Sequence, residues 1–392
     1  MMKKCVSVVL ALVMALALCS VSWADDGTIT LDDFLKALNV TESTTSVTFD
    51  GASHEKAAGG KLTVKWSPVS GCFDSHHMLG ADCPKTEATG NTPKRVNNGL
   101  AQFQLFTGRD ISISIKNVNF VYVPADVKIC INSGWKGVFT KDAAPSGQLF
   151  FENTGSFTIT DCSFDNVALT TWNGNGTTAI SGCTFKNVYN NYAIKDIAGK
   201  EVNITGNRFE NCGGAIMTSS NSTLTNNVES VNISSNQFSN IDVAGTAPQE
   251  KVGTRGIIQI AAATKVTGET SITLDSNTAE NCGPVLRQLN ESVDMSKTSG
   301  NLSGLVNANG KLTATDDSKS AAGENGSKEI EVPYTPTPEK PSNNYYYYSP
   351  STTTTDTTKG SPKTFDAGIA LYVGMALTSA AGLAYTGKKR ED

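Results

Sequence analysis

VNITGNRFENC (residues 202–212) and VNISSNQFSNI (residues 231–241) are two copies of one repeating unit. Each copy alternates apolar and polar residues around an isoleucine and then reaches a phenylalanine, as with Ile204 and Phe209 in the first copy. This period of two over five to eight residues is typical of a β-strand with one buried face.

Further copies lie on both sides of these two. They are FTITDCSFDNV (157–167), AISGCTFKNV (179–188), the earlier ISIKNVNFVYV (113–123) and SITLDSNTAENC (271–282), which has Ala279 in the phenylalanine position. Phe164, Phe185, Phe209 and Phe238 are 21, 24 and 29 residues apart, and the step of 44 from Phe120 to Phe164 is interpreted as two coils. One strand per 20–29 residues cannot pair with itself, but it can pair with the equivalent strand of the next coil.

This repeat predicts an all-β fold, a right-handed parallel β-helix solenoid spanning residues 44–312. The pattern resembles the pectate-lyase-like superfamily of β-helix proteins. The resemblance implies the fold only, since function has to be argued from a site.

Two further columns follow the repeat. Asparagines lie two places after the phenylalanine position, where their stacked amides are expected to form a ladder; they are Asn166, Asn187, Asn211, Asn240 and Asn281. Four cysteines, Cys162, Cys183, Cys212 and Cys282, occupy repeat columns. Cys212 and Cys282 lie in a column that holds Val or Ile on other coils, so they are interpreted as buried. We expect an intervening coil to separate Cys212 from Cys282, which argues against a disulfide between them.

The N-terminal part of the mature chain predicts a helix. GTITLDDFLKALNV (27–40) places Leu31, Phe34 and other apolar residues on one helical face, with Thr30 as N-cap and Asp33 three residues later. Residues 25–43 are therefore expected to cap the open end of the first coil and to protect it from edge pairing.

The two termini predict export. Residues 1–24 have a basic start, a short apolar core and a small-residue cleavage site, as in a secretory signal peptide. Residues 313–360 are rich in Thr, Ser and Pro and are expected to form a disordered spacer. Residues 367–386 carry no charge, and as a helix they would be about 30 Å long, which is enough to cross a membrane. A basic tip follows them.

Segment 361–392 resembles the cell-wall sorting signal of Gram-positive bacteria. The five residues before the apolar stretch are Ser361, Pro362, Lys363, Thr364 and Phe365. The resemblance implies that a sortase cleaves after Thr364 and joins the chain to peptidoglycan, which places the protein on the extracellular cell surface. Pro362 and Thr364 match the family pattern, whereas Ser361 and Phe365 replace its Leu and Gly. A retained membrane anchor is the alternative.

Cys72 and Cys83 flank a loop that also contains His76 and His77. A disulfide between the two cysteines, a Cys/His metal site and free thiols are all compatible with the sequence. The disulfide is favoured because the chain is expected to be exported, and the spacing matches no standard zinc site, so no metal site is assigned.

Composition argues against nucleic acid as a partner, because 32 Lys and Arg face 37 Asp and Glu without a basic block. The favoured hypothesis is a binding module, an adhesin for an extracellular carbohydrate or host surface ligand. Its candidate contact residues are Trp172, Tyr189 and Tyr192, since aromatic rings suit sugars and protein hot spots. No cofactor is expected.

The alternative is a polysaccharide lyase or glycoside hydrolase acting on an acidic, plant or mucin polysaccharide. Its weak catalytic candidates are Lys195, Asp196, Arg255 and Arg287, which are far apart in the sequence and have to be joined by loops. A lyase of this kind would use calcium.

Overall fold

The structure is a computed structural model. It describes residues 27–41, 43–67, 71–73, 93–95, 102–131, 136–139, 146–172, 176–197, 199–218, 228–260, 266–288, 293–316 and 327–335. All of these belong to one unit, which ends at Thr337.

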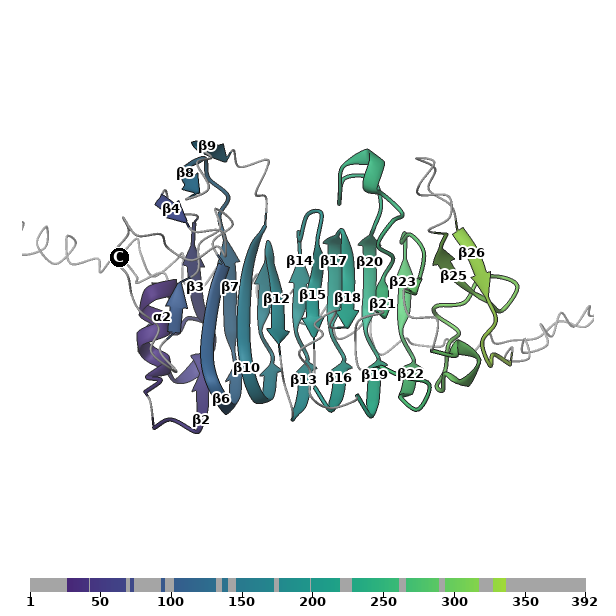
Figure 1. The fold of residues 1–392 in the computed structure, drawn as a ribbon, viewed down its shortest axis with the longest axis horizontal. Coiled ribbons are helices and arrows are strands. Elements are labelled where there is room, and N and C mark those ends of the chain that lie inside the picture. Colours follow the sequence, from purple (N-terminus) through teal and green to yellow (C-terminus); the bar gives the residue numbers. More distant parts are fainter. Residues whose placement is uncertain are drawn as a thin grey trace, which may run out of the picture. The chain divides into compact units, whose positions relative to one another are not determined.

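The described strands stack mainly in parallel, each in register with the equivalent strand of the next coil (Figure 1). An eight-stranded sheet carries the phenylalanine positions and is called the phenylalanine sheet. Its strands are β1 (Thr28–Thr30), β3 (Leu62–Trp66), β7 (Val118–Tyr122), β11 (Ser163–Asp165), β14 (Thr184–Lys186), β17 (Arg208–Cys212), β20 (Gln237–Ile241) and β23 (Thr278–Glu280).

A fifteen-stranded sheet contains two series of strands, which the long strands β6 (Gln102–Lys116) and β10 (Gly147–Thr160) join. The isoleucine series continues through β2 (Ser46–Asp50), β13 (Thr177–Ser181), β16 (Glu201–Thr205), β19 (Ser230–Ser234) and β22 (Ser271–Asp275). The third series contains β12 (Val167–Trp172), β15 (Tyr192–Ile197), β18 (Gly214–Thr218), β21 (Ile258–Ile260) and β24 (Leu286–Gln288). A central coil therefore contributes three strands, for example β13, β14 and β15, which is the arrangement of a parallel β-helix.

The core is a set of stacked columns. Phe164, Phe185, Phe209 and Phe238 pair in register, and their rings stack at centroid distances of 4.5, 5.1 and 5.1 Å. The isoleucines of the isoleucine series and the aliphatic residues of the third series are also buried. The register predicted from the phenylalanine repeat is confirmed.

The step from Phe120 to Phe164 is one coil, so its interpretation as two coils was wrong. Phe120 pairs directly with Phe164, and their rings stack at 5.2 Å. The additional residues leave the coil to form β8 (Val127–Ile131) and β9 (Lys136–Phe139). In a separate three-stranded sheet, β8 pairs with β4 (Gly71–Phe73) on one side and with β9 on the other. An excursion of this kind lengthens the sequence step without adding a rung.

The two ends of the solenoid differ. At the first coils, helix α2 (Leu31–Leu38) begins at Thr30, whose hydroxyl accepts from the Asp33 N–H, and Phe34 packs edge-on against Phe49 and Phe120. At the other end, β25 (Leu312–Thr315) pairs in parallel with β24 and antiparallel with β26 (Ser327–Ile330). Strand β5 (Pro93–Arg95) pairs antiparallel with β6.

Two asparagine ladders link successive coils, a buried one through Asn207, Asn236 and Asn277 and an exposed one. The exposed ladder runs from Asn281 through Asn240 and Asn211 to Asn187, with amide hydrogen bonds of 2.6, 3.1 and 3.5 Å. These residues have positive φ angles, which asparagine tolerates better than most residues. Asn166 instead accepts from Ser146, so the ladder is confirmed from the second of its five predicted members onward.

The cysteines follow the predicted columns with one difference. Cys162, Cys183 and Cys212 are buried, whereas Cys282, near the end of the stack, is half-buried. Cys212 pairs in register with Ile241, whose carbonyl accepts from Gly283 on the following coil. The coil that contains Ile241 therefore separates Cys212 from Cys282, as expected.

Several sequence predictions fall outside the described residues. These are the signal peptide, the sorting residues and the apolar stretch 367–386, together with Cys83 and the side chain of Cys72. Of the predicted spacer 313–360, residues 313–316 and 327–335 are described, and there β25 ends and β26 forms. In the part of the chain that is described, no helix combines the length and apolar character required to cross a membrane.

Candidate functional site

A long loop between β20 and β21 forms the base of the candidate site. It begins at Asp242, includes the short 3-10 helix η2 (Gln249–Lys251), and returns to the coil at Gly256. One carboxylate fixes its end: Asp242 accepts from the backbone N–H groups of Gly253 (2.9 Å), Arg255 (2.9 Å) and Gly256 (2.7 Å). This clamp determines where the Arg255 side chain leaves the loop.

The environment of Asp242 acts on its pKa in two directions. Burial disfavours the charged carboxylate and raises the pKa, while the three backbone N–H groups and nearby Arg255 lower it. The net direction is upward from the usual aspartate value.

Gly256 brings Arg255 close to Arg287. A Cβ on Gly256 would lie 2.9 Å from the Pro284 carbonyl oxygen and 3.2 Å from the Arg287 backbone nitrogen, so only glycine allows this approach. The two arginines are close enough for the charge of Arg287 to lower the pKa of Arg255, an effect added to the larger one of burial.

Tyr192 connects three coils at the same place. It pairs with Gly214 on the next coil, where its ring occupies the space that a Cβ would need. Its hydroxyl donates to the Arg255 carbonyl oxygen at 2.6 Å. Burial raises the pKa of this phenol, and the positive charges of Arg287 and Arg255 oppose the rise.

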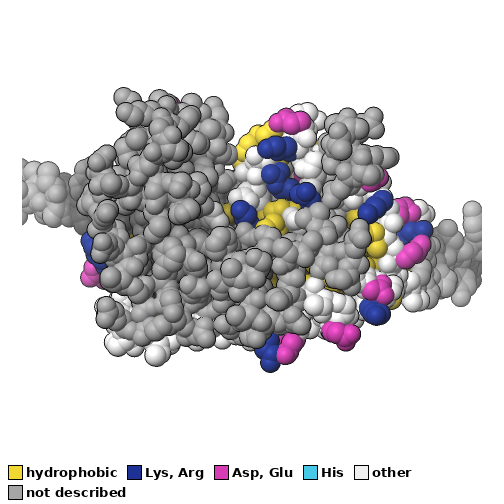
Figure 2. Space-filling model, viewed as in Figure 1, with side chains coloured by type: hydrophobic (Ala, Val, Ile, Leu, Met, Phe, Trp, Pro, Cys, Tyr) yellow, Lys and Arg dark blue, Asp and Glu magenta, His cyan; other side chains and the backbone are white. Residues whose placement is uncertain are grey.

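The two guanidinium groups retain unused hydrogen-bonding capacity. Arg255 Nη1 and Arg287 Nε are buried nitrogen atoms without a hydrogen-bond partner, although each side chain as a whole is half-buried. Lys and Arg side chains gather on this face of the molecule at the level of the loop between β20 and β21 (Figure 2). Among the described residues the site is therefore positively charged, and two of its donors lack acceptors.

The structure brings together two of the four weak catalytic candidates, Arg255 and Arg287. Ile194 pairs with Ile216 on the next coil, so Lys195 is level with Met217, the residue after Ile216. Met217 pairs with Gln259, and Gln259 pairs with Arg287. Lys195 thus lies three rungs from Arg287, about 14 Å at about 4.8 Å per rung. Asp196 is also in β15, but its side chain is not among those described.

The aromatic candidates have different environments. Tyr192 is only 4% exposed and forms part of the arginine site. Tyr189 is half-buried, and its backbone N–H donates to the Ser146 hydroxyl. Trp172 ends β12, and its side chain lies outside the described set.

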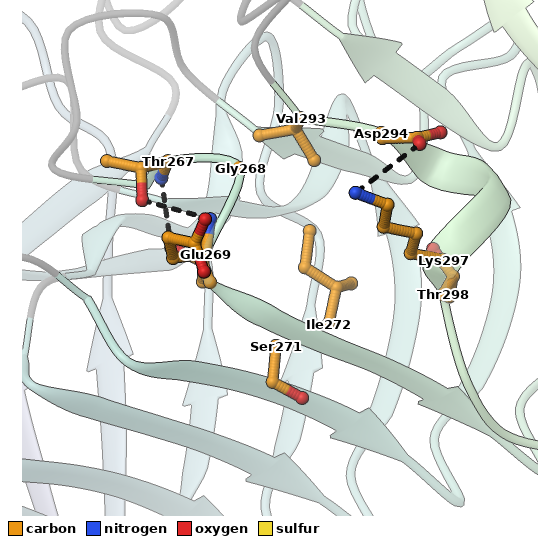
Figure 3. A pocket seen from close by; sticks show the side chains of 10 residues that line it. Thr267, Gly268, Glu269, Ser271, Ile272, Val293, Asp294, Lys297 and Thr298 are labelled. Carbon is orange, nitrogen blue, oxygen red and sulfur yellow. Dashed lines mark hydrogen bonds and ion pairs between the residues drawn. The ribbon is translucent and has the colours of Figure 1, made fainter.

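A second candidate is a polar pocket of about 300 Å³ beside β22 and the 3-10 helix η3 (Met295–Lys297) (Figure 3). Ile272 and Val293 line it together with Glu269 and Lys297. Its charged groups are largely exposed, and Lys297 already lies 3.9 Å from Asp294. Exposed groups of this kind bind weakly, so the arginine site is the stronger candidate.

Metal binding has no candidate site among the described side chains. They contain no group of three or more His, Cys, Asp or Glu residues that could hold a metal ion.

The fold and this site define a parallel β-helix protein with a cationic site on its third series of strands. Over residues 132–247 the chain is similar to a family described as adenovirus EB1 55K protein / large t-antigen. These residues correspond to the central coils and make up less than a third of the 392 residues. No curated protein and no solved structure matches the chain.

Sequence reasoning missed Asp242 and the contribution of Gly256. The usable signal was the 41-residue step from Phe238 to Ala279, which is far longer than its neighbours. Such a step predicts a loop, and loops on a rigid scaffold are where sites occur.

Proposed function

We propose that this chain is an exported surface protein whose β-helix binds an extracellular carbohydrate or host ligand. The observation that carries the proposal is the convergence of Tyr192, Arg255 and Arg287 from three different coils. Buried donors without acceptors are unfavourable within a folded chain, and a bound ligand supplies the missing acceptors.

Display on the cell surface is supported by the sequence features of both termini. In this proposal the signal peptide directs export, the sorting segment links the chain to peptidoglycan, and the Thr/Ser/Pro-rich spacer holds the β-helix away from the envelope. Helix α2 covers the first coil and protects its edge from pairing with other chains.

A polysaccharide lyase is the second candidate, and one observation favours it. Burial lowers the pKa of Arg255, which is the direction required of a group that accepts a proton. The neighbouring Arg287 would stabilise negative charge on a bound substrate.

One experiment separates the two functions. The full-length chain is applied to a glycan array, and the same glycans are incubated with it and analysed for shortened products. Binding without shortening supports the binding module, whereas new unsaturated or reducing ends establish an enzyme. Absence of binding to glycans and to host cells would reject the proposed function.

A further inference from the structure

The hydrogen-bonding balance of the arginine site indicates the chemistry of its ligand. Asp242 is the carboxylate that acts on Arg255, and both of its oxygen atoms already accept backbone N–H groups. The Arg255 carbonyl oxygen accepts from Tyr192. The acceptors of Asp242 and of the Arg255 carbonyl are thus engaged, while two guanidinium nitrogens are not.

From this arrangement we propose that Arg255 and Arg287 together bind an oxyanion, a carboxylate or sulfate group carried by the ligand. This inference rests on the proposed function, since it names the ligand chemistry of the same site. A guanidinium group presents N–H donors in a planar fork that matches two oxygen atoms of one anion. Two such groups side by side repel each other, and an anion between them removes that repulsion.

Three features position the pair before the ligand arrives. The Asp242 clamp holds the backbone of Arg255, Gly256 permits the close approach to the Arg287 backbone, and the register of β21 with β24 fixes Arg287 on its rung. Tyr192 holds the loop from the preceding coils through its bond to the Arg255 carbonyl. Preorganised donors lower the entropic cost of binding.

The test compares dextran, dextran sulfate and carboxymethyl dextran as immobilised probes for the full-length chain. Sulfate and carboxylate are the two sources of the same chemistry, so the two modified dextrans distinguish them. We expect the chain to bind at least one of them at least about tenfold more tightly than dextran. We expect Arg255→Gln and Arg287→Gln each to lose most of that difference.

Lys200→Gln is the matched control, because it also removes one positive charge. Lys200 pairs with Glu229 on the exposed surface, and we expect its variant to change binding by less than about twofold. Arg287→Lys retains the charge but not the fork, so an intermediate loss is expected. If the glutamine variants have lowered melting temperatures, their loss of binding could come from unfolding, and Arg287→Lys then serves as the test of the site.

The outcomes separate the inference from the proposed function. If the Lys200 variant lost as much binding to the modified dextrans as the arginine variants, the chain would be attracted by net charge alone, and the inference would be overturned. Tight, arginine-independent binding to neutral glycans would also overturn it while leaving the proposed function in place. Arginine-dependent binding of inorganic sulfate, without binding to any glycan or host cell, would support the anion site and reject the proposed function.

Discussion

At the scale of single residues, buried asparagines connect each coil to the next. The Oδ1 atom of Asn207, Asn236 or Asn277 accepts the backbone N–H of the equivalent residue one coil earlier. Each Nδ2 group donates to a carbonyl oxygen of that same earlier coil. One side chain therefore satisfies two backbone groups that the turn would otherwise leave buried and unpaired.

We expect Asn236→Leu to lower the free energy of unfolding by about 3 kcal/mol, because each buried group left unpaired costs about 1–3 kcal/mol. Urea unfolding of the purified chain measures the change. Asn240→Gly is the control: it removes rungs of the exposed ladder, and glycine tolerates its φ of 55°. A loss in the control as large as in Asn236→Leu would mean that burial does not distinguish the two ladders.

Asp242 predicts a pH dependence of stability. Its folded-state pKa is raised above the ordinary value, so the folded chain binds this proton more tightly than the unfolded chain does. The resulting stabilisation is present below the unfolded pKa and is lost as the pH rises through the folded pKa. Asp242→Asn has no such titration.

We therefore expect the stability of wild type relative to Asp242→Asn to fall as the pH rises from about 4 toward neutrality. Urea unfolding at several pH values measures this difference. For Asp294→Asn, at an exposed carboxylate whose pKa is lowered, we expect the corresponding difference to rise with pH instead, and to do so below about pH 4. If the stability of wild type relative to Asp242→Asn rose with pH, the pKa of Asp242 could not be raised in the folded chain.

At the scale of elements, the phenylalanine strands show how much the sequence can predict. Alternation and a constant position of Phe, Asn and Cys predicted the phenylalanine sheet, its register and the ladder, because stacked coils require equivalent residues at equivalent places. The third series escaped prediction because VALTTW, YAIKDI and GAIMT share no marker residue. The arginine site depends on that series and on the Gly256 contact, neither of which has a repeat signature.

The stacked column predicts a large cost for losing one ring. Phe209 lies 5.1 Å from both Phe185 and Phe238 and is fully buried. We expect Phe209→Ala to destabilise the chain by about 3–5 kcal/mol, since neighbouring coils cannot close the cavity.

Chemical denaturation measures this loss, with Arg208→Ala as the neighbouring control. Arg208 is exposed and forms an ion pair with Glu210 on the same strand, so its removal should change stability by less than about 1 kcal/mol. Similar values for the two variants would be incompatible with the stacked column.

At the scale of the whole molecule, the predicted topology separates display from binding. In the proposed function, the β-helix carries the binding site and the sorting segment would carry the attachment. Substitution of one should therefore leave the other intact, which makes attachment testable by itself.

We expect muramidase digestion of producing cells to release the protein joined to peptidoglycan fragments through Thr364. Thr364→Ala should move the protein to the membrane fraction, because the acyl group of this threonine is the one that a sortase cysteine would take. Thr358→Ala, within the spacer, is the control and should behave as wild type. Wild-type chains that retain Lys388–Asp392 and dissolve only in detergent would show that Phe365 prevents cleavage.

The in-register pairing of coils has a mechanical consequence. Backbone hydrogen bonds between neighbouring strands point along the axis of the stack, so tension applied along that axis loads one rung at a time rather than all rungs together. Under such tension we expect coils to peel away in succession, and each of the coils between Phe120 and Ala279 would release 21 to 44 residues of slack chain. A stretched molecule of this kind would yield gradually and absorb work over a long extension.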